Sequence, residues 1–492
     1  MVLLALACTD APASVSPAAM PDPGDWAIAG PGGPTRAFQS GEIDVACAAL
    51  TGGPEDVEHH NLVGIYDGWL VLPWAPEDGG GGVSVYEFAD PCAPVKVGEA
   101  YAELMRESHT LAIAEVAGRT VLAVDAHHDD DRGGIGFWDL TDPAAPAWIG
   151  DLELPDYHYP DAYFRVALST FWQGDLLFVS AGFNGVFVVD VSDPESPELL
   201  SQHTEVGFLA GSFHVIGNLA LASSAGLSKT LIWDVGDPDD WQLLADFDVA
   251  DEEGVARPYY FANVGGRYAM FARKEPGGGP VVYDLADPGD PVRLGAGDAP
   301  DGDGGYVARH HDTLFQGESE FGQRYDFADP TEIAPVARVD MAGDFDTLVP
   351  IGNVAVASVD EGADPGMATL VFPWAEEPDA RGPTAELTNP VDGATWIPTS
   401  GRVGLSFDEQ IEPKSVHAGS FRVWREDGAA VAGRFYAQET LANFVPDAPL
   451  EPDTTYFVEV PAGGIADVTG NPTEATLSFA FSTGAEVAAR PW

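Results

Sequence analysis

A short pattern, in which a run of apolar residues leads into Asp and Pro, recurs along most of this chain. Its clearest copy is VFVVDVSDPESP at residues 186–197, and a degraded seventh copy at 370–383 has Glu377-Pro378 in place of Asp-Pro. The other five copies occupy residues 83–94, 135–146, 231–241, 281–291 and 324–335. The six Asp-Pro steps begin 42 to 52 residues apart, at Asp90, Asp142, Asp193, Asp237, Asp287 and Asp329. Repeats of this length indicate a solenoid, a propeller or a similar array.

The composition of each repeat favours a propeller. A run such as VFVVDV has the β-branched and aromatic content of a buried strand, and the Pro residues after it end the strand because Pro donates no ladder hydrogen bond. One or two apolar runs precede each copy, as in 171–182 and 214–226, and a shorter run follows it. Four strands per repeat with almost no helical periodicity are typical of a propeller blade. We predict a seven-bladed β-propeller over residues 42–382, with six or eight blades as alternatives because the end repeats are the least regular.

A different pattern follows the last repeat. Apolar and polar residues alternate in RVGLSF (402–407), YFVEV (456–460) and LSFAFS (477–482), and turn signals come about every ten residues. This pattern predicts a second all-β domain, a β-sandwich over residues 383–484, followed by a short tail at 485–492.

Both domains resemble known families. The repeat is similar to that of the LVIVD-repeat family, which also runs from apolar residues through Asp to DPxxP; residues 186–197 match it nearly position by position, and the resemblance covers about two thirds of the chain. Residues 383–484 resemble the SbsA-type bacterial Ig-like domain in NPVDGAT (389–395), AGGIADVTGNP (462–472) and FAFSTG (479–484). The first resemblance implies an extracytoplasmic propeller without an assigned reaction. The second implies a surface spacer or adhesive module without catalytic residues.

The N-terminus resembles a bacterial lipoprotein signal. Residues 1–8 are apolar and end in Leu6-Ala7-Cys8, so the resemblance implies that Cys8 carries the lipid and that Thr9 directs the protein to an outer membrane. No Lys or Arg precedes this stretch, and the alternative is an ordinary apolar start. Residues 9–41, rich in Ala, Pro, Ser and Gly, are predicted to be a disordered tether. No other apolar run approaches the ~20 residues of a spanning helix.

The charge of the chain narrows its partners. The 492 residues carry a formal net charge of −57, and nucleic acid is excluded as a partner because phosphate binding requires Lys and Arg. Solubility in a salty or extracellular setting and binding of cations are the two interpretations of such acidity. An extracytoplasmic compartment would permit a disulfide between Cys47 and Cys92, although two separate buried thiols are equally compatible with the spacing.

Histidines recur just ahead of the first apolar run of several repeats. They are His59, His60, His109, His214, His310 and His311, and Tyr163 and Tyr259 hold that place in two other repeats. Because the innermost strands of a propeller line a central channel, these imidazoles are candidates for a ring that binds a transition metal or an anion. The alternative is that each side chain satisfies backbone groups within its own blade.

Two acidic stretches offer the oxygen ligands that Ca²⁺ prefers. One contains Asp125, Asp129 and Asp131, and the other contains Asp298, Asp301 and Asp303. Neither has the full spacing of a calcium loop, and solvated turns are the alternative. The motifs of serine hydrolases, zinc proteases, P-loops and dinucleotide sites are missing from the sequence. The cofactors that the sequence suggests are metal ions, either Ca²⁺ at the acidic stretches or a transition metal at the histidines.

Three functions are compatible with these patterns. The first is a monomeric, lipid-anchored, non-enzymatic binding or scaffold protein at the cell surface or facing the periplasm, with a surface protein or glycan as ligand. The second is a metal-dependent hydrolase or lyase at the channel mouth, which would use the histidines with carboxylates such as Asp344 and Asp346. The third is a structural or adhesive component of the envelope. Tandem repeats, a spacer-type domain and the missing catalytic motifs favour the first, since fold alone does not specify an activity.

Overall fold

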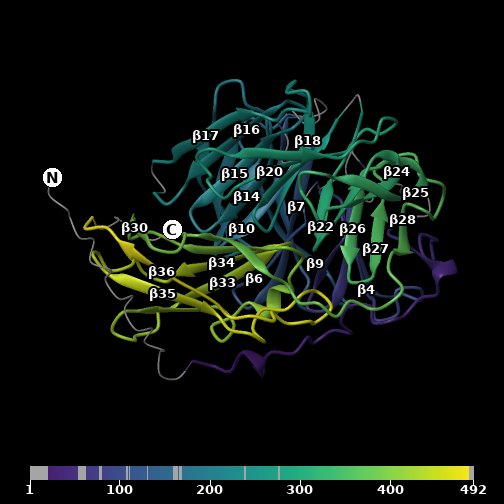
Figure 1. Ribbon diagram of the computed structural model, residues 1–492. Coiled ribbons are helices and arrows are strands. Elements are labelled where there is room, and N and C mark those ends of the chain that lie inside the picture. Colours follow the sequence, from purple (N-terminus) through teal and green to yellow (C-terminus); the bar gives the residue numbers. More distant parts are fainter. Residues whose placement is uncertain are drawn as a thin grey trace, which may run out of the picture.

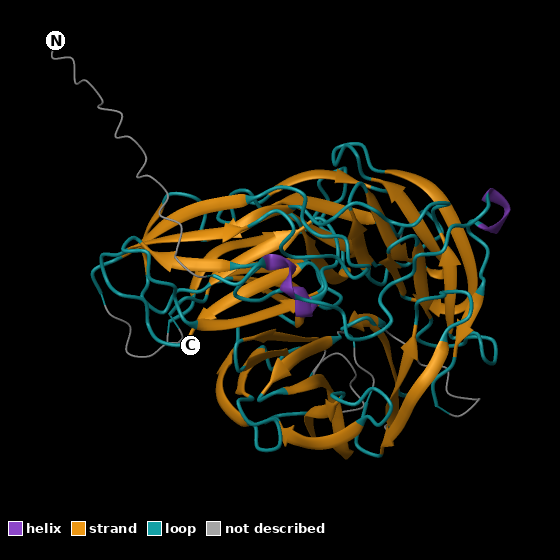
Figure 2. Cartoon of the chain, turned by 90° about the horizontal axis from the view of Figure 1, so that it is seen from below, coloured by secondary structure: helices purple, strands orange, loops and turns teal. Residues whose placement is uncertain are grey.

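The computed structural model describes residues 20–53, 62–76, 80–106, 109, 111–129, 131–158, 165, 169–237, 240–274 and 277–486. These residues form nine four-stranded β-sheets and three short 3-10 helices, η1 (Pro23–Asp25), η2 (Ser40–Glu42) and η3 (Pro413–Ser415). Seven sheets are arranged around a ring as a β-propeller, and two form an Ig-like β-sandwich (Figures 1 and 2). The predicted all-β fold is confirmed. Within the described ranges, no helix is both long and apolar enough to span a membrane.

Blades 1 to 6 each consist of four consecutive antiparallel strands, which follow one another from the inside of the ring outward. Blade 1 has β2 (Gly64–Tyr66), β3 (Trp69–Trp74), β4 (Gly81–Glu87) and β5 (Val95–Ala102); blade 2 has β6 (Ala112–Val116), β7 (Arg119–Asp129), β8 (Arg132–Asp139) and β9 (Ala147–Glu153). Blade 3 has β10 (Ser169–Gln173), β11 (Leu176–Ser180), β12 (Val186–Asp190) and β13 (Glu198–His203); blade 4 has β14 (Ala210–Ile216), β15 (Leu219–Ser224), β16 (Lys229–Asp234) and β17 (Gln242–Asp248). Blade 5 has β18 (Tyr259–Gly265), β19 (Tyr268–Arg273), β20 (Pro280–Asp284) and β21 (Val292–Ala296); blade 6 has β22 (Val307–His310), β23 (Thr313–Gly317), β24 (Ser319–Asp326) and β25 (Ala334–Phe345).

Blade 7 takes its outermost strand from the beginning of the domain. Its inner strands are β26 (Thr347–Ile351), β27 (Val354–Ser358) and β28 (Thr369–Pro373), and β1 (Ala48–Leu50) pairs antiparallel with β28. This pairing fastens the two ends of the propeller together and covers an edge of β28 that would otherwise present unpaired backbone groups.

The recurring Asp-Pro pattern builds the turn between the third and the outermost strand of a blade. In blade 3 the carboxylate of Asp190 accepts a hydrogen bond from the amide of Ser192 (2.9 Å), and that of Asp193 accepts one from the amide of Glu195 (3.1 Å). Val191 between them is fully buried. Equivalent aspartates make both turns in blades 2, 5 and 6. The repeat is therefore a turn signal, in which Asp oxygens fix backbone amides two residues ahead.

The propeller has two unlike faces. On one, which we call the turn face, lie the two-residue turns that join the innermost strand of each blade to the second strand, such as Gly217-Asn218 between β14 and β15. On the other, the loop face, lie the connections from the second to the third strand and the connections between blades. The innermost strands β14 and β18 point the same way, and each ends at the turn face.

The C-terminal domain is a sandwich of two sheets. One has the order β29 (Ala385–Asn389), β31 (Val403–Phe407), β34 (Leu441–Pro446) and β33 (Gly433–Gln438). The other has the order β30 (Ala394–Ile397), β36 (Leu477–Thr483), β35 (Thr455–Val460) and β32 (Arg422–Arg425). The alternating residues of β35 and β36 place Val458, Phe479 and Phe481 in a shared core with Phe444 from the first sheet.

The Ig-like domain covers the turn face of the propeller. Its strands β33 and β34 lie beside β6, β10 and β14 (Figure 1). Backbone amides in the turns of blades 1, 4, 5 and 6 donate hydrogen bonds to this domain: Asp67 N to Glu412 Oε1 (2.9 Å), Gly217 N to Asn443 Oδ1 (2.7 Å), Asn218 N to Asn389 Oδ1 (2.8 Å), Gly266 N to Phe407 O (2.5 Å) and His311 N to Asp408 O (2.8 Å). Blade 2 contributes the ion pair of Glu115 with Lys414 (2.7 Å), and blade 3 the hydrogen bond from Trp172 N to Gln438 Oε1 (3.3 Å).

The same docking closes one end of the central channel. A cavity of about 70 Å³ is lined by innermost-strand residues such as Ile65, Ile113 and Val307, and also by Gln410 and Gln438 of the Ig-like domain. The channel therefore does not run open through the molecule, because the Ig-like domain forms its floor at the turn face.

Residues 20–41 pack along both domains, which differs from the predicted tether. The side chain of Phe38 is 3 % exposed and belongs to the core that contains Leu50. The amides of Ala29 and Gly30 each donate to Asp67 at 2.9 Å. A stretch rich in Pro and Gly forms no core of its own, but here it buries its few apolar side chains against surfaces that two other domains supply. Cys8 and the rest of residues 1–19 lie outside the described residues.

Candidate functional site

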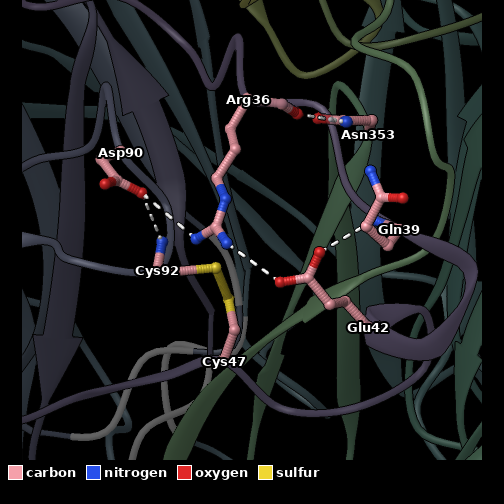
Figure 3. The surroundings of a disulfide bond; sticks show 7 residues. All are labelled: Arg36, Gln39, Glu42, Cys47, Asp90, Cys92 and Asn353. Atoms are coloured by element: carbon pink, nitrogen blue, oxygen red, sulfur yellow. Dashed lines mark hydrogen bonds and ion pairs between the residues drawn. A yellow bond between two sulfur atoms is a disulfide. The ribbon is translucent and has the colours of Figure 1, made fainter.

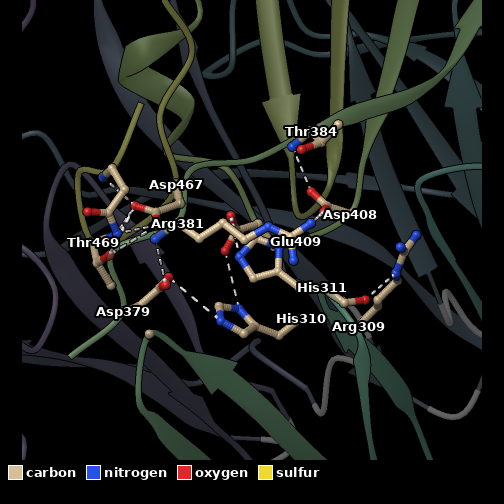
Figure 4. A network of polar contacts seen from close by, with 12 residues as sticks. Arg309, His310, His311, Asp379, Arg381, Thr384, Asp408, Glu409, Asp467 and Thr469 are labelled. Carbon is tan, nitrogen blue, oxygen red and sulfur yellow. Dashed lines mark hydrogen bonds and ion pairs between the residues drawn. The ribbon is translucent and has the colours of Figure 1, made fainter. Parts of the chain in front are cut away.

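Three segments far apart in the sequence meet beside blade 6. Strand β22 ends at His310, and His311 begins the tight turn into β23 with a positive φ of 51°. Asp379 lies in the linker between the domains. Glu409 follows β31 of the Ig-like domain, in a segment whose side chains are buried because it passes over the turn face. Figure 4 shows these four side chains converging on one another.

Short distances join the members of this group, which we call the seam cluster (His310, His311, Asp379 and Glu409). The Nδ1 and Nε2 atoms of His310 lie 3.2 Å from Glu409 Oε2 and 3.6 Å from Asp379 Oδ2. His311 Nε2 lies 3.2 Å from Glu409 Oε1. Among the described residues, this is the one group in which three or more His, Cys, Asp or Glu side chains bring ligand atoms together, all within 4.8 Å of one another.

The electrostatics of the seam cluster reflect its burial. Loss of water, together with the nearby carboxylates of Asp467, Asp379 and Asp408, raises the pKa of Glu409 to about 11. Burial and the adjacent ring of His311 lower the pKa of His310 to about 4. Both shifts favour uncharged groups, since an isolated charge is costly in a buried site. Burial therefore opposes an ion pair between His310 and Glu409.

A groove gives access to the cluster from solvent. It has a volume of about 520 Å³, and its walls include His310, His311, Asp379, Trp374 and Arg381. The indole of Trp374 packs edge-on against the ring of His310, with 5.3 Å between ring centroids. The groove thus reaches the cluster along the linker that joins the two domains.

The other predicted histidines do not join this cluster. His109 lies at the loop face, where its Nδ1 is 3.1 Å from the hydroxyl of Tyr306. His214 lies within β14, where its Nε2 is 3.0 Å from the carbonyl oxygen of Ala262 in the next blade. His310 and His311 are at the opposite, turn face, so the described histidines form no ring at one level of the channel. His59 and His60 lie outside the described residues.

The acidic residues of blade 2 contact basic side chains of the same blade. Arg132 Nε lies 2.9 Å from Asp129 Oδ2, and His158 Nδ1 lies 3.2 Å from Asp131 Oδ1. Asp125 is buried within β7, away from these exposed residues. The three aspartates predicted as calcium ligands therefore do not converge on a common point.

The acidic stretch of blade 5 is arranged similarly at the loop face. Arg273 Nη2 lies 3.5 Å from Asp298 Oδ1, and Lys274 Nζ lies 3.4 Å from Asp303 Oδ1. Burial opposes the charge of Lys274, but carboxylates led by Asp346 outweigh it and raise its pKa. Asp301 is an exposed turn residue in this stretch.

Asp344 and Asp346, the carboxylates expected to act with the histidines, lie far from His310 and His311 in the fold. Asp346 immediately precedes β26 at the loop face, next to Asp344 near the end of β25. His310 and His311 lie at the turn face, where β22 ends. These two carboxylates therefore lie at the opposite face of the propeller from His310 and His311.

The two remaining cysteines form a disulfide. Cys47, just before β1, is bonded to Cys92 in the outer turn of blade 1 (Figure 3). Beside it, Arg36 contacts Glu42 at 3.0 Å and Asp90 at 3.9 Å. The bond joins the strand that closes blade 7 to the neighbouring blade 1, across the junction between the two ends of the ring.

Comparisons with known proteins give one family match, which agrees with the C-terminal Ig-like domain, and several distant structural similarities. Residues 379–483 match the family model of a bacterial Ig-like domain. A search of curated proteins finds no significant match to the chain. Similar solved structures include the WD40 repeats of RRP9 (10 % identity, TM-score 0.49, covering 69 % of this chain and 99 % of that one) and the periplasmic gluconolactonase PpgL of Pseudomonas aeruginosa (11 % identity, TM-score 0.46, covering 68 % and 93 %). The WD40 β-propeller domain of Doa1 is 13 % identical, with a TM-score of 0.44 and coverage of 66 % and 96 %. Identities this low concern the fold alone.

Proposed function

We propose that this protein is a non-enzymatic binding or scaffold protein that faces the outside of a bacterial cell or its periplasm, and that it binds its ligand through the loop face of the propeller. The observation that carries this proposal is the docking of the Ig-like domain. It occupies the turn face of the propeller with buried hydrogen bonds, which leaves the loop face as the surface available to a partner. A bacterial Ig-like domain over residues 379–483 supports an extracellular or surface location.

The loop face has features of a binding surface. Exposed apolar side chains project from its connections in three successive blades: Phe183 (50 % exposed), Val206 (93 %), Leu227 (43 %) and Val255 (45 %). Apolar side chains exposed on a protein surface can contribute to an interaction site when they lie together. Loops held on a rigid scaffold are also where binding residues are concentrated.

Two variants of blade 3 test the use of this face. Phe183→Asp places a charge on the loop face, and Leu200→Asp places the same charge on the outermost strand β13, where Leu200 is 43 % exposed. The full chain and both variants are applied to an array of bacterial surface glycans and to surface proteins of bacterial envelopes. We expect binding that is lost with Phe183→Asp and retained with Leu200→Asp. Equal binding by both variants, or conversion of a bound compound to a product, would contradict the proposal.

The membrane anchor is a separate part of the proposal. We propose that Cys8 carries a lipid that holds the protein at an outer membrane, on the basis of the apolar residues that precede it. The anchor is tested by expressing the full chain and the Cys8→Ser variant in a Gram-negative host and then separating the membrane fraction from the soluble fraction. The unmodified chain is expected in the membrane fraction and the variant in the soluble fraction, and an identical distribution of the two would contradict the anchor.

A further inference from the structure

We propose that the seam cluster binds one first-row transition-metal dication, with Zn²⁺ as the best match, and that the ion ties the Ig-like domain to the propeller. The ligands would be His310, His311, Asp379 and Glu409, whose ligand atoms lie within 4.8 Å of one another. In a tetrahedral zinc site the ligand atoms are about 3.4 Å apart, as bonds of about 2.0–2.2 Å require. Two contacts of 3.2 Å in the cluster already match that spacing.

The donor set selects the class of ion. Two imidazoles with two carboxylates suit Zn²⁺ and its neighbours in the first transition row, whereas Ca²⁺ takes six or more oxygen ligands and Mg²⁺ an octahedron of oxygens. The cluster thus differs in kind from the acidic stretches at Asp129 and Asp303, which offer oxygen atoms and are engaged by Arg132 and Lys274.

Buried polar atoms in the cluster lack hydrogen bonds. His311 Nε2, Asp379 Oδ2 and Glu409 Oε1 have no partner in hydrogen-bonding geometry, although His311 Nε2 is only 3.2 Å from Glu409 Oε1. His311 is 8 % exposed and Glu409 is 1 % exposed. Buried polar groups are rarely left unsatisfied, and a bound cation would satisfy all three atoms at once.

The surroundings orient one of the imidazoles for an ion. His311 Nδ1 lies 3.0 Å from Asp408 Oδ2, and Asp408 is itself held by the amide of Thr384 (2.6 Å). Donation of the Nδ1 proton to a carboxylate leaves the lone pair of Nε2 directed at the cluster. A carboxylate in this position is the usual support of a metal-bound histidine.

The placement of the ligands implies a structural role for the ion. Blade 6 supplies His310 and His311, the interdomain linker supplies Asp379, and the Ig-like domain supplies Glu409. The groove of about 520 Å³ gives the ion a path from solvent. Because a ligand that binds only the docked state stabilises it, zinc is expected to make separation of the two domains harder.

Metal content of the full chain tests the proposal directly. The purified protein is treated with a chelator, dialysed into 150 mM NaCl to weaken diffuse binding to the acidic surface, and titrated with Zn²⁺ by calorimetry. Elemental analysis then gives the ratio of zinc to protein. We expect one tightly bound Zn²⁺ per chain, and Co²⁺ in its place is expected to give the visible absorption bands of a tetrahedral site. A ratio near zero, or Co²⁺ without those bands, would overturn the proposal, and would leave a proton shared between Glu409 and the imidazoles as the state of the cluster.

Three variants locate the site. His311→Ala and the nearly isosteric Glu409→Gln are each expected to lower zinc affinity at least tenfold. His128→Ala is the matched control, because His128 also contacts an aspartate, Asp151 (2.8 Å), but at the acidic edge of blade 2. Unchanged affinity in Glu409→Gln, or an equal loss in His128→Ala, would overturn the assignment. If His311→Ala does not fold, the Co²⁺ spectrum of the unmodified chain and the comparison of Glu409→Gln with His128→Ala still decide the question.

Discussion

Asn443 in β34 lies at the interface between the domains, and its replacement should lower the stability of the protein clearly. Its Oδ1 accepts hydrogen bonds from the amide of Gly217 (2.7 Å) and from Gln173 Nε2 (3.0 Å), and its Nδ2 donates to the carbonyl of Val215 (2.9 Å). The residue is 1 % exposed. Val215 lies on β14, the innermost strand of blade 4, which has no strand on its inner side to take up these backbone groups. Asn443→Ala therefore leaves buried backbone groups of the propeller without partners.

The expected cost follows from those groups. Gln173 Nε2 retains its second hydrogen bond, to the carbonyl of Gly217 (2.8 Å), so only the two backbone groups, Gly217 N and Val215 O, lose their partners. At about 1–3 kcal/mol for each buried unsatisfied group, the substitution should lower the free energy of unfolding by about 3 kcal/mol. With an unfolding entropy of about 2.1 cal/mol/K per residue, this lowers the melting temperature by about 3 °C if roughly 440 residues unfold as one unit. The same loss of free energy lowers the melting temperature by about 15 °C if an Ig-like domain of roughly 100 residues unfolds alone.

Differential scanning calorimetry of the full chain separates these cases. Ser478→Ala is the control, because Ser478 lies on the exposed side of β36 in the same domain, away from the propeller. We expect a shift of at least about 3 °C for Asn443→Ala and less than about 1 °C for Ser478→Ala. A melting curve of Asn443→Ala that superimposes on that of the unmodified protein would refute the view that these hydrogen bonds hold the domains together.

Three further outcomes follow from the structure. Burial raises the pKa of Glu318 to about 8, so between pH 5 and 8 the folded chain keeps a proton that the unfolded chain has released. The free energy of unfolding should therefore fall as pH rises through this window, by up to about 1.4 kcal/mol per pH unit. Glu318→Gln should remove that slope, as measured by urea titrations at each pH. Replacing both Cys47 and Cys92 by Ser opens a link between residues 45 apart and should lower the free energy of unfolding by about 3–4 kcal/mol, measured by urea denaturation and compared with the unmodified chain under reductant. A net charge of −57 implies self-repulsion, so raising NaCl from 10 to 150 mM should raise the melting temperature, and a fall would contradict this.

The seam cluster shows where inference from the sequence ends. His310 and His311 are recognisable as candidate ligands because histidines recur at the start of several repeats. Asp379 and Glu409 carry no such signal, since one lies in the linker and the other in a different domain. The acidic pair Asp408-Glu409 lies directly after the apolar run of β31, and each of the two is 1 % exposed. Only the docking of the domains brings these side chains to the histidines.

The N-terminal segment illustrates a related limit. Composition alone predicts that residues 9–41 remain unstructured, because so few apolar side chains cannot offset the entropy of ordering. In the structure Phe38 enters the core of the propeller, and Asn353 donates a hydrogen bond to the carbonyl of Arg36 (2.8 Å). The apolar cluster that contains Phe38 combines residues of the first blade, such as Leu70, with residues of the last blade, such as Val371, and no local pattern in residues 9–41 indicates it.

The sequence by itself determined the repeated blades and the presence of a second β-domain, and it favoured seven blades over six or eight, which the structure confirms. These features depend on local rules, namely the apolar runs of strands and the aspartates whose oxygens fix the following turn, so each repeat specifies its own blade. The tertiary structure alone decided that the Ig-like domain covers the turn face, that Asn443 becomes a buried polar contact there, and that two carboxylates meet His310 and His311. Such contacts depend on how two completed surfaces fit together. Residues that meet only through docking share no periodicity along the chain.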